Sequence, residues 1–149
     1  MGYIDNNLMN DEQIYYRAKL HWAIFITPII FFLFGIMLFG NNQNSNSAMN
    51  FFILISIILF VRALLNYTSS EFCITNKRII MKVGFIRRKT IEIVLNKVEG
   101  IQANQGIFGR ILNYGSIIIS GSGGLKSPFH KILAPIKFRN AAQEQISKV

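Results

Sequence analysis

Residues 70–95 read SEFCITNKRIIMKVGFIRRKTIEIVL, and this stretch predicts an antiparallel β-meander. Ser70–Thr75 and Arg78–Val83 are short runs rich in β-forming residues, and an Asn-Lys pair that favours a turn separates them. After Gly84, the segment Ile86–Leu95 ends in an alternation of apolar with other residues, which is typical of a strand with one buried face. We therefore expect three strands joined by tight turns.

The sequence that follows predicts more strands and then a helix. Ile117–Ile119 is a β-branched run between two glycines, and Phe129–Ile136 fits a further strand that Pro135 ends. The last apolar residues recur at helical spacing, with charged residues on the rest of the helix surface, so we expect an amphipathic helix over 138–148. Many short strands followed by one helix indicate an α+β domain, a small barrel or curled sheet closed by a C-terminal helix.

Upstream of the meander lie two apolar runs. Ala23–Gly40 has 18 residues without a charge, and at about 1.5 Å per residue it spans roughly 27 Å, close to the hydrocarbon thickness of a bilayer. Met49–Leu65 is a second run, whose one charge, Arg62, lies near its end. The polar segment Asn41–Ser47 separates the two runs. The sequence therefore predicts a transmembrane α-helical hairpin with spans at about 22–40 and 48–65.

Two other interpretations of these runs are disfavoured. A cleaved signal peptide has a shorter apolar part and a small-x-small cleavage site, whereas this run is long and its leader carries three acidic residues. Core helices of a soluble bundle would have a polar face, and these runs have none. The basic residues Arg17, Lys19 and Arg62 flank the outer ends of the runs, so the positive-inside rule predicts that both termini are cytoplasmic.

The charge is distributed unevenly along the chain. Apolar residues make up 51% of the sequence and charged residues 15%, yet the formal net charge is +9, from 16 Lys and Arg against 7 Asp and Glu. Residues 1–65 are neutral, so the whole +9 belongs to residues 66–149. We therefore expect a cytoplasmic N-terminal segment (1–21), a transmembrane hairpin (22–65) and a basic cytoplasmic domain (66–149) beside the anionic leaflet.

Few residues point to catalysis or to a cofactor. The one cysteine, Cys73, cannot form an intramolecular disulfide, and with His21 and His130 far away in sequence it makes no recognisable metal site. The glycine-rich stretch at 121–124 lacks the third glycine and the following helix of a nucleotide-binding loop. The glutamates of the domain are dispersed, and His130 has no matching nucleophile. The sequence therefore predicts a non-enzymatic protein with no catalytic residue, no cofactor and no metal.

Basic residues gather at one predicted turn, around Gly84. A hairpin there would bring them to one end of the sheet, where they meet lipid phosphates while an apolar residue reaches the acyl boundary. The other interpretation, an exposed hairpin whose charges are simply solvated, carries equal weight. The candidate contacts for anionic lipid or a partner are Lys82, Phe85, Ile86, Arg87, Arg88 and Lys89.

With these residues in view, over roughly residues 15–146 the chain resembles the bacterial PH-like membrane proteins, in which a transmembrane helical hairpin precedes a pleckstrin-homology-type domain. The resemblance implies a split, seven-stranded β-barrel capped by the helix at 138–148. It implies no enzyme activity and names no ligand. It rests on Phe72–Ile79 (an aromatic residue followed by Ile-Thr-x-x-Arg), on Gly84 and the basic residues after it, on Ile93–Ile101, and on Gly109–Gly115 leading into Ser116–Ser120.

These features favour one function over two others. The leading hypothesis is a multi-pass protein of the bacterial cytoplasmic (inner) membrane whose PH-like domain is an interaction or scaffold module, contacting anionic lipid headgroups and an unknown protein partner or a second copy of itself. The alternative is an accessory subunit of a membrane enzyme or transporter complex, although the spans carry no acidic residue for an ion path. Nucleic-acid binding is not expected, because aromatic and basic residues are not interleaved on any one element.

Overall fold

The computed structural model describes residues 3–39, 46–85, 88–122 and 124–148, and the chain divides into two compact units. The sheet unit comprises Met1–His21 and Ser69–Val149, and the helical unit comprises Trp22–Thr68. The sheet unit therefore joins the N-terminal segment to the region that the sequence assigns to the PH-like domain, and the helical unit is inserted between these two parts of the chain.

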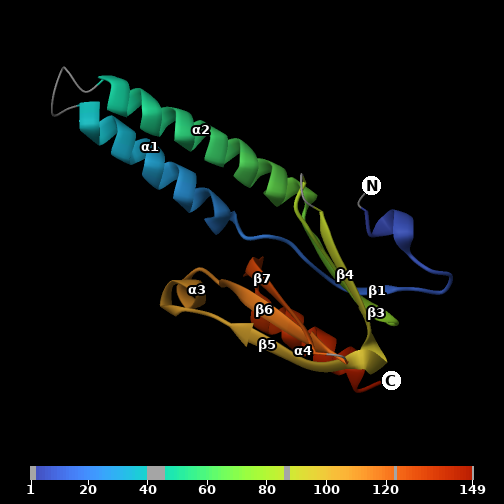
Figure 1. Ribbon diagram of the computed structural model, residues 1–149. Helices are drawn as coiled ribbons and strands as arrows, with labels where there is room; N and C mark the ends of the chain where they lie inside the picture. The colour runs from blue at the N-terminus through green and yellow to red at the C-terminus, as the bar shows by residue number, and fades with distance from the viewer. Residues whose placement is uncertain (1–2, 40–45, 86–87, 123, 149) are drawn as a thin grey trace. The chain divides into compact units, whose positions relative to one another are not determined.

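Among the described residues, the sheet unit contains seven strands in two antiparallel sheets (Figure 1). The order is β1-β2-β3-β4 in the first sheet and β5-β6-β7 in the second. Helix α3 connects β5 to β6, and α4 follows β7. The elements are β1 (Ile14–Ala18), β2 (Glu71–Thr75), β3 (Arg78–Val83), β4 (Lys89–Val94), β5 (Val98–Asn104), α3 (Ile107–Ile111), β6 (Tyr114–Gly121), β7 (Leu125–Leu133) and α4 (Pro135–Ile146), with short 3-10 turns at Asp5–Asn7 and Leu95–Lys97.

This architecture confirms the mixed helix and sheet class and the hairpin of β3 with β4. The predicted boundary between the last strand and the helix is wrong: the strand expected over Phe129–Ile136 ends at Leu133, and α4, expected over 138–148, begins at Pro135 and ends at Ile146. The reason is that proline lacks an N–H and has a helix-compatible φ, so it suits the first turn of a helix better than the end of a strand. Strands β1 and β5 were not predicted from the residue pattern.

The main core lies between the two sheets. Phe72 of β2 meets Phe129 of β7 edge to face, with ring centroids 5.9 Å apart. Phe138 of α4 is fully buried, and its ring lies 6.1 Å from that of Tyr16 on β1. Helix α4 packs against strands of both sheets. It therefore closes the core, as the sequence predicts for the C-terminal helix.

The first sheet is covered on its other face as well. Because strand residues alternate between faces, Cys73 and Ile80, a cross-strand pair, lie opposite the face that Phe72 presents to the core. They form a second apolar cluster with Ile4 from the N-terminal segment, and all three are almost completely buried. Burial on both faces explains why β2 and β3 are nearly continuous apolar runs rather than alternating ones.

The helical unit contains a short turn (Trp22–Phe25), α1 (Ile26–Phe39) and α2 (Asn46–Ser69). The two helices run antiparallel, because Phe25 lies against Phe60 and Tyr67, whereas Phe34 lies against Phe52. The buried Ser56 hydroxyl donates a hydrogen bond to the Pro28 carbonyl at 2.9 Å. Small and hydroxylated residues at the contact are typical of helices that pack in lipid.

One helix among the described residues is long and apolar enough to cross a membrane, Ser47–Ser69, and only 11% of its apolar window is buried within the protein. The apolar helical stretch of the first run, counted from the turn at Trp22 to Met37 of α1, is shorter than a helix must be to count as a candidate span. The structure therefore contains one candidate span, and the expected pair of spans stays a prediction. The predicted loop between the runs lies largely outside the described residues.

Candidate functional site

The basic turn joins β3 to β4. Val83 and Lys89 form the last cross-strand pair, so residues 84–88 make the connection. Gly84 has φ +93°, a left-handed conformation that glycine adopts without strain. Its N–H donates to the Ser70 hydroxyl at 3.5 Å. The turn therefore lies at the end of the sheet where the chain arrives from α2.

The basic side chains of this hairpin separate rather than converge. Lys82 is half-buried, and its ammonium lies 4.6 Å from the ring centroid of Tyr3, on the sheet face that the N-terminal segment covers. Lys89 of β4 pairs with Val83, the neighbour of Lys82, so its side chain lies on the other face of the sheet. Its ammonium is 5.8 Å from the Phe129 ring centroid. The structure thus places these two candidates on opposite faces of the first sheet.

The tip of the turn is exposed. Phe85 has 49% of its surface accessible, and Arg88 and Lys89 are exposed too. Ile86 and Arg87, the other two candidates, lie outside the described residues. An exposed aromatic ring beside cationic side chains suits a surface that is apolar inside and anionic outside, such as a bilayer interface.

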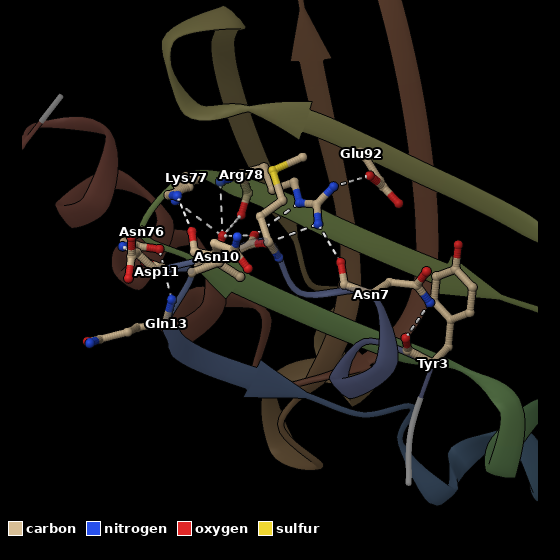
Figure 2. Close-up of polar contacts among 12 residues, drawn as sticks. Tyr3, Asn7, Asn10, Asp11, Gln13, Asn76, Lys77, Arg78 and Glu92 are labelled. Carbon is tan, nitrogen blue, oxygen red and sulfur yellow. Dashed lines mark hydrogen bonds and ion pairs between the residues drawn. The ribbon is translucent and has the colours of Figure 1, made fainter.

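The N-terminal segment binds the first sheet through its backbone. The backbone N–H groups of Tyr3 and Ile4 each donate to the Glu71 carboxylate at 3.1 Å. Farther along, the Lys77 ammonium donates to the Asn10 carbonyl at 2.6 Å, and Asn76 exchanges backbone and side-chain hydrogen bonds with Gln13 and Asp11. Figure 2 shows the contacts of Asn76 and Lys77 with the N-terminal segment, around the turn between β2 and β3.

Arg78 is the centre of this polar network (Figure 2). Its Nε and Nη2 donate to the two oxygens of Glu12, each at 3.0 Å. Its Nη1 donates to Glu92 of β4 at 2.6 Å, and Nη2 also donates to the Asn7 carbonyl at 2.7 Å. The guanidinium is therefore satisfied by protein groups, and binding an external phosphate would require that it release one of them.

Thr75 explains the Ile-Thr-x-x-Arg pattern on which the resemblance rests. Its hydroxyl oxygen accepts the N–H of Lys77 at 3.2 Å and of Arg78 at 3.0 Å, which closes the turn between β2 and β3. The same hydroxyl lies 2.7 Å from a Glu12 oxygen, to which it donates. The pattern thus holds a turn and a buried ion pair. Sequence reasoning missed Glu12 because it lies 66 positions from Arg78.

The contacts set the ionisation of Glu12. Burial by itself would raise the pKa of this carboxyl, but hydrogen bonds from Arg78, the Met9 N–H and Thr75, with the charge of Arg78, lower the pKa below its ordinary value of 4.5. A carboxyl whose pKa is lower in the folded than in the unfolded chain stabilises the fold above the unfolded pKa. That stabilisation disappears as the pH falls through the folded pKa.

We expect the sheet unit to lose stability as the pH is lowered below about 4.5, the ordinary pKa of Glu12. In urea titrations at a series of pH values, the difference in midpoint between the wild type and Glu12→Gln should be largest near neutral pH and shrink in acid. Glu99→Gln, at an exposed position, controls for the loss of one charge. A difference that is constant over pH would contradict the assignment.

The described residues contain no group of three or more His, Cys, Asp and Glu placed to hold a metal ion. Cys73 is fully buried, and burial raises the pKa of its thiol to about 11. At neutral pH this thiol is therefore protonated and inaccessible, which is typical of a core cysteine rather than of a nucleophile.

Comparison with known proteins gives one match. No curated protein and no solved structure matches the chain. The family model described as a bacterial PH domain matches residues 24–146, and so covers the apolar helices together with β2 through α4. With well over half of the sequence matched, the chain belongs to the bacterial PH domain family.

Proposed function

We propose that this protein is a non-enzymatic, membrane-anchored interaction module: its helical unit spans the bacterial cytoplasmic membrane as a hairpin, and its PH domain lies on the cytoplasmic side with the β3–β4 turn toward anionic headgroups. A bacterial PH domain is compatible with an interaction module. The observation that carries the membrane part of the proposal is the exposed surface of α2.

Between Phe51 and Val61, every exposed residue of α2 is apolar. Leu54, Ile57 and Ile58 are each more than half exposed, and so are Leu33 and Met37 of α1. Exposed apolar surface of this extent is rare on soluble monomers, and a lipid bilayer would remove it from water. Arg62, in the C-terminal part of α2, lines an open pocket of about 140 Å³ together with Asn66 and Thr27. A long arginine side chain suits this part of a span, because it can snorkel to the bilayer interface.

The position of the basic turn supports the second part of the proposal. Ser70 follows α2 directly, and the Gly84 N–H contacts its hydroxyl, so the turn is within a few residues of the point where the chain would leave the bilayer. At that distance the surface potential of an anionic leaflet acts on Arg88 and Lys89. Phe85 would lie at the headgroup level.

Topology is tested with single engineered cysteines in the full chain, because buried Cys73 should not react with a maleimide. In intact cells, a membrane-impermeant maleimide should label Ser47→Cys, at the start of α2, but label Gln143→Cys on α4 only after lysis. The protein should also stay in the membrane fraction during alkaline carbonate extraction. Labelling of both sites in intact cells, or extraction by carbonate, would contradict membrane anchoring in this orientation.

Lipid contact is tested with an environment-sensitive dye on Phe85→Cys in the full chain, reconstituted in phosphatidylglycerol or phosphatidylcholine vesicles. We expect a blue-shifted emission in the anionic vesicles that weakens with salt and after replacement of Arg87, Arg88 and Lys89 by alanine. The matched control removes three basic residues elsewhere: Lys97, Lys137 and Arg139. Equal spectra in the two lipids would mean that the turn is merely solvated.

A further inference from the structure

Among the described residues of the sheet unit, the most exposed apolar cluster is on α3. Ile107, Phe108 and Ile111 have 80%, 74% and 74% of their surface accessible. They lie on a helix of five residues, so they form one compact apolar knob between β5 and β6. No prediction from the residue pattern assigned a role to these three side chains.

Contacts with neighbouring residues fix the position of this knob. The Gln105 side-chain amide donates to the carbonyls of Gly109 and Tyr114, each at 3.2 Å, which ties α3 to the start of β6. A Cβ on Gly109 would lie 2.5 Å from the Tyr114 carbonyl oxygen, so only glycine allows the helix to approach this closely. A loop that was free to fold back could bury its apolar side chains, whereas this one keeps them outward.

The knob lies at the end of the sheet unit from which the chain enters the helical unit. Leu20 bridges Ile132 of β7, and the His21 N–H donates to the Lys131 carbonyl at 2.7 Å. The His21 ring stacks on Tyr114, with centroids 5.1 Å apart. His21, the last residue of the segment Met1–His21, therefore packs on the start of β6, to which α3 is tied.

The second chain connection leaves from the same end. Ala18 of β1 pairs with Phe72 of β2, so His21 and Ser70 both continue past this end of the first sheet. Ser70 is in turn the residue that contacts the basic turn through Gly84. The α3 knob, the basic turn and both connections thus share one end of the sheet unit.

The surroundings of the knob are basic. Arg110 is exposed within α3, and Lys19 is exposed beside β7. A pocket of about 310 Å³ next to Phe108 is lined by His130 and Lys131, and none of its described lining residues is an Asp or Glu. Apolar side chains surrounded by cationic ones match an anionic bilayer interface, where the first enter the acyl boundary and the second contact phosphates.

We infer that α3 is a membrane-interface anchor: Ile107, Phe108 and Ile111 insert into the cytoplasmic leaflet and fix the orientation of the PH domain on it. The inference rests on the proposed function, because it requires that the helical unit spans the same bilayer. The partner that covers the knob is then the bilayer in which the chain is anchored. We expect the knob to insert to a depth of about 5–10 Å, as other interfacial helices do.

The test uses a dye on Phe108→Cys in the full chain, reconstituted in vesicles that contain phosphatidylglycerol and brominated acyl chains. A dye on Gln143→Cys, on α4, is the water-exposed control, and a dye on Leu54→Cys reports whether α2 is in lipid. We expect brominated lipid to quench the dyes at 108 and 54 but not at 143, and aqueous iodide to quench only the dye at 143. A labelling stoichiometry of one dye per chain would confirm that Cys73 has stayed buried and that the fold is intact.

The other outcomes overturn the inference in distinguishable ways. If lipid quenches the dye at 54 while iodide quenches the dye at 108 as readily as the dye at 143, the knob is solvated. The proposed membrane anchoring by the helical unit is then retained, and the inference about α3 is wrong. If the dye at 108 is protected from both quenchers and dilution in lipid removes the protection, a second copy covers the knob. If lipid quenches neither 54 nor 108, the proposed function and this inference fail together.

Discussion

Replacing Arg78 by alanine is expected to destabilise the sheet unit by about 3–5 kcal/mol, because it leaves the Glu12 carboxylate buried without its cation. The Glu12 side chain has no exposed surface and that of Arg78 has 10%, so solvent screens the pair little. Arg78→Lys should also destabilise the unit strongly, since a single ammonium cannot reproduce the paired contacts to Glu12 and the further contacts to Glu92 and Asn7.

The measurement is a urea titration of the full chain in mild detergent, with Cys73 labelling as the probe of opening. Arg139→Ala, an arginine beside Asn140 on α4, is the matched control and should unfold within about 0.5 kcal/mol of the wild type. Combining Arg78→Met with Glu12→Gln should cost less than the sum of the two single changes. Equal midpoints for Arg78→Ala and Arg139→Ala would refute the central role of this ion pair.

Removing residues 2–8 is expected to make Cys73 reactive while the sheet unit remains folded. This deletion takes away Ile4, which covers Cys73 and Ile80, but leaves Glu12 to pair with Arg78. Exposure would let the pKa of the Cys73 thiol fall from about 11 toward its ordinary range. The labelling rate near neutral pH should then rise on the order of a hundredfold from the thiolate fraction alone.

The rate is measured with a maleimide on the full chain and on the deletion variant, with the urea-unfolded protein as the upper limit. Ile4→Ala keeps the chain length and should give an intermediate rate, which separates loss of cover from loss of the fold. An unchanged rate in the deletion variant would show that the N-terminal segment does not cover Cys73 in solution.

The residue pattern predicted β3 and the C-terminal helix well, because each carries a local signal. Strand β3 is bounded by a turn pair and a glycine, and α4 has apolar residues at helical spacing. Strand β1 was missed although Ile14, Tyr16 and Ala18 alternate with exposed residues, because the run is short and directly precedes an apolar segment. Strand β5 contains a glycine and polar residues, which weaken its signal.

The candidate site was predictable only in part, because sequence places a turn but not the directions of its side chains. The basic residues were expected at the β3–β4 turn and Gly84 begins it, yet Lys82 packs on Tyr3 from a segment nearly eighty positions away. The exposure of Phe108 could not be predicted from the sequence either. An Ile-Phe pair next to glycines is usually interpreted as part of the core until the packing is known.

The insertion of the helical unit between β1 and β2 has a consequence for biosynthesis. Residues 3–18 leave the ribosome before both apolar helices, but their partners, among them Phe72, Cys73 and Arg78, are made only after them. Edge strand β1 and Glu12 therefore wait unpaired while more than fifty residues are synthesised. Such distant pairings fold late, so residues 3–18 are synthesised before the helical unit but form their native contacts only after it.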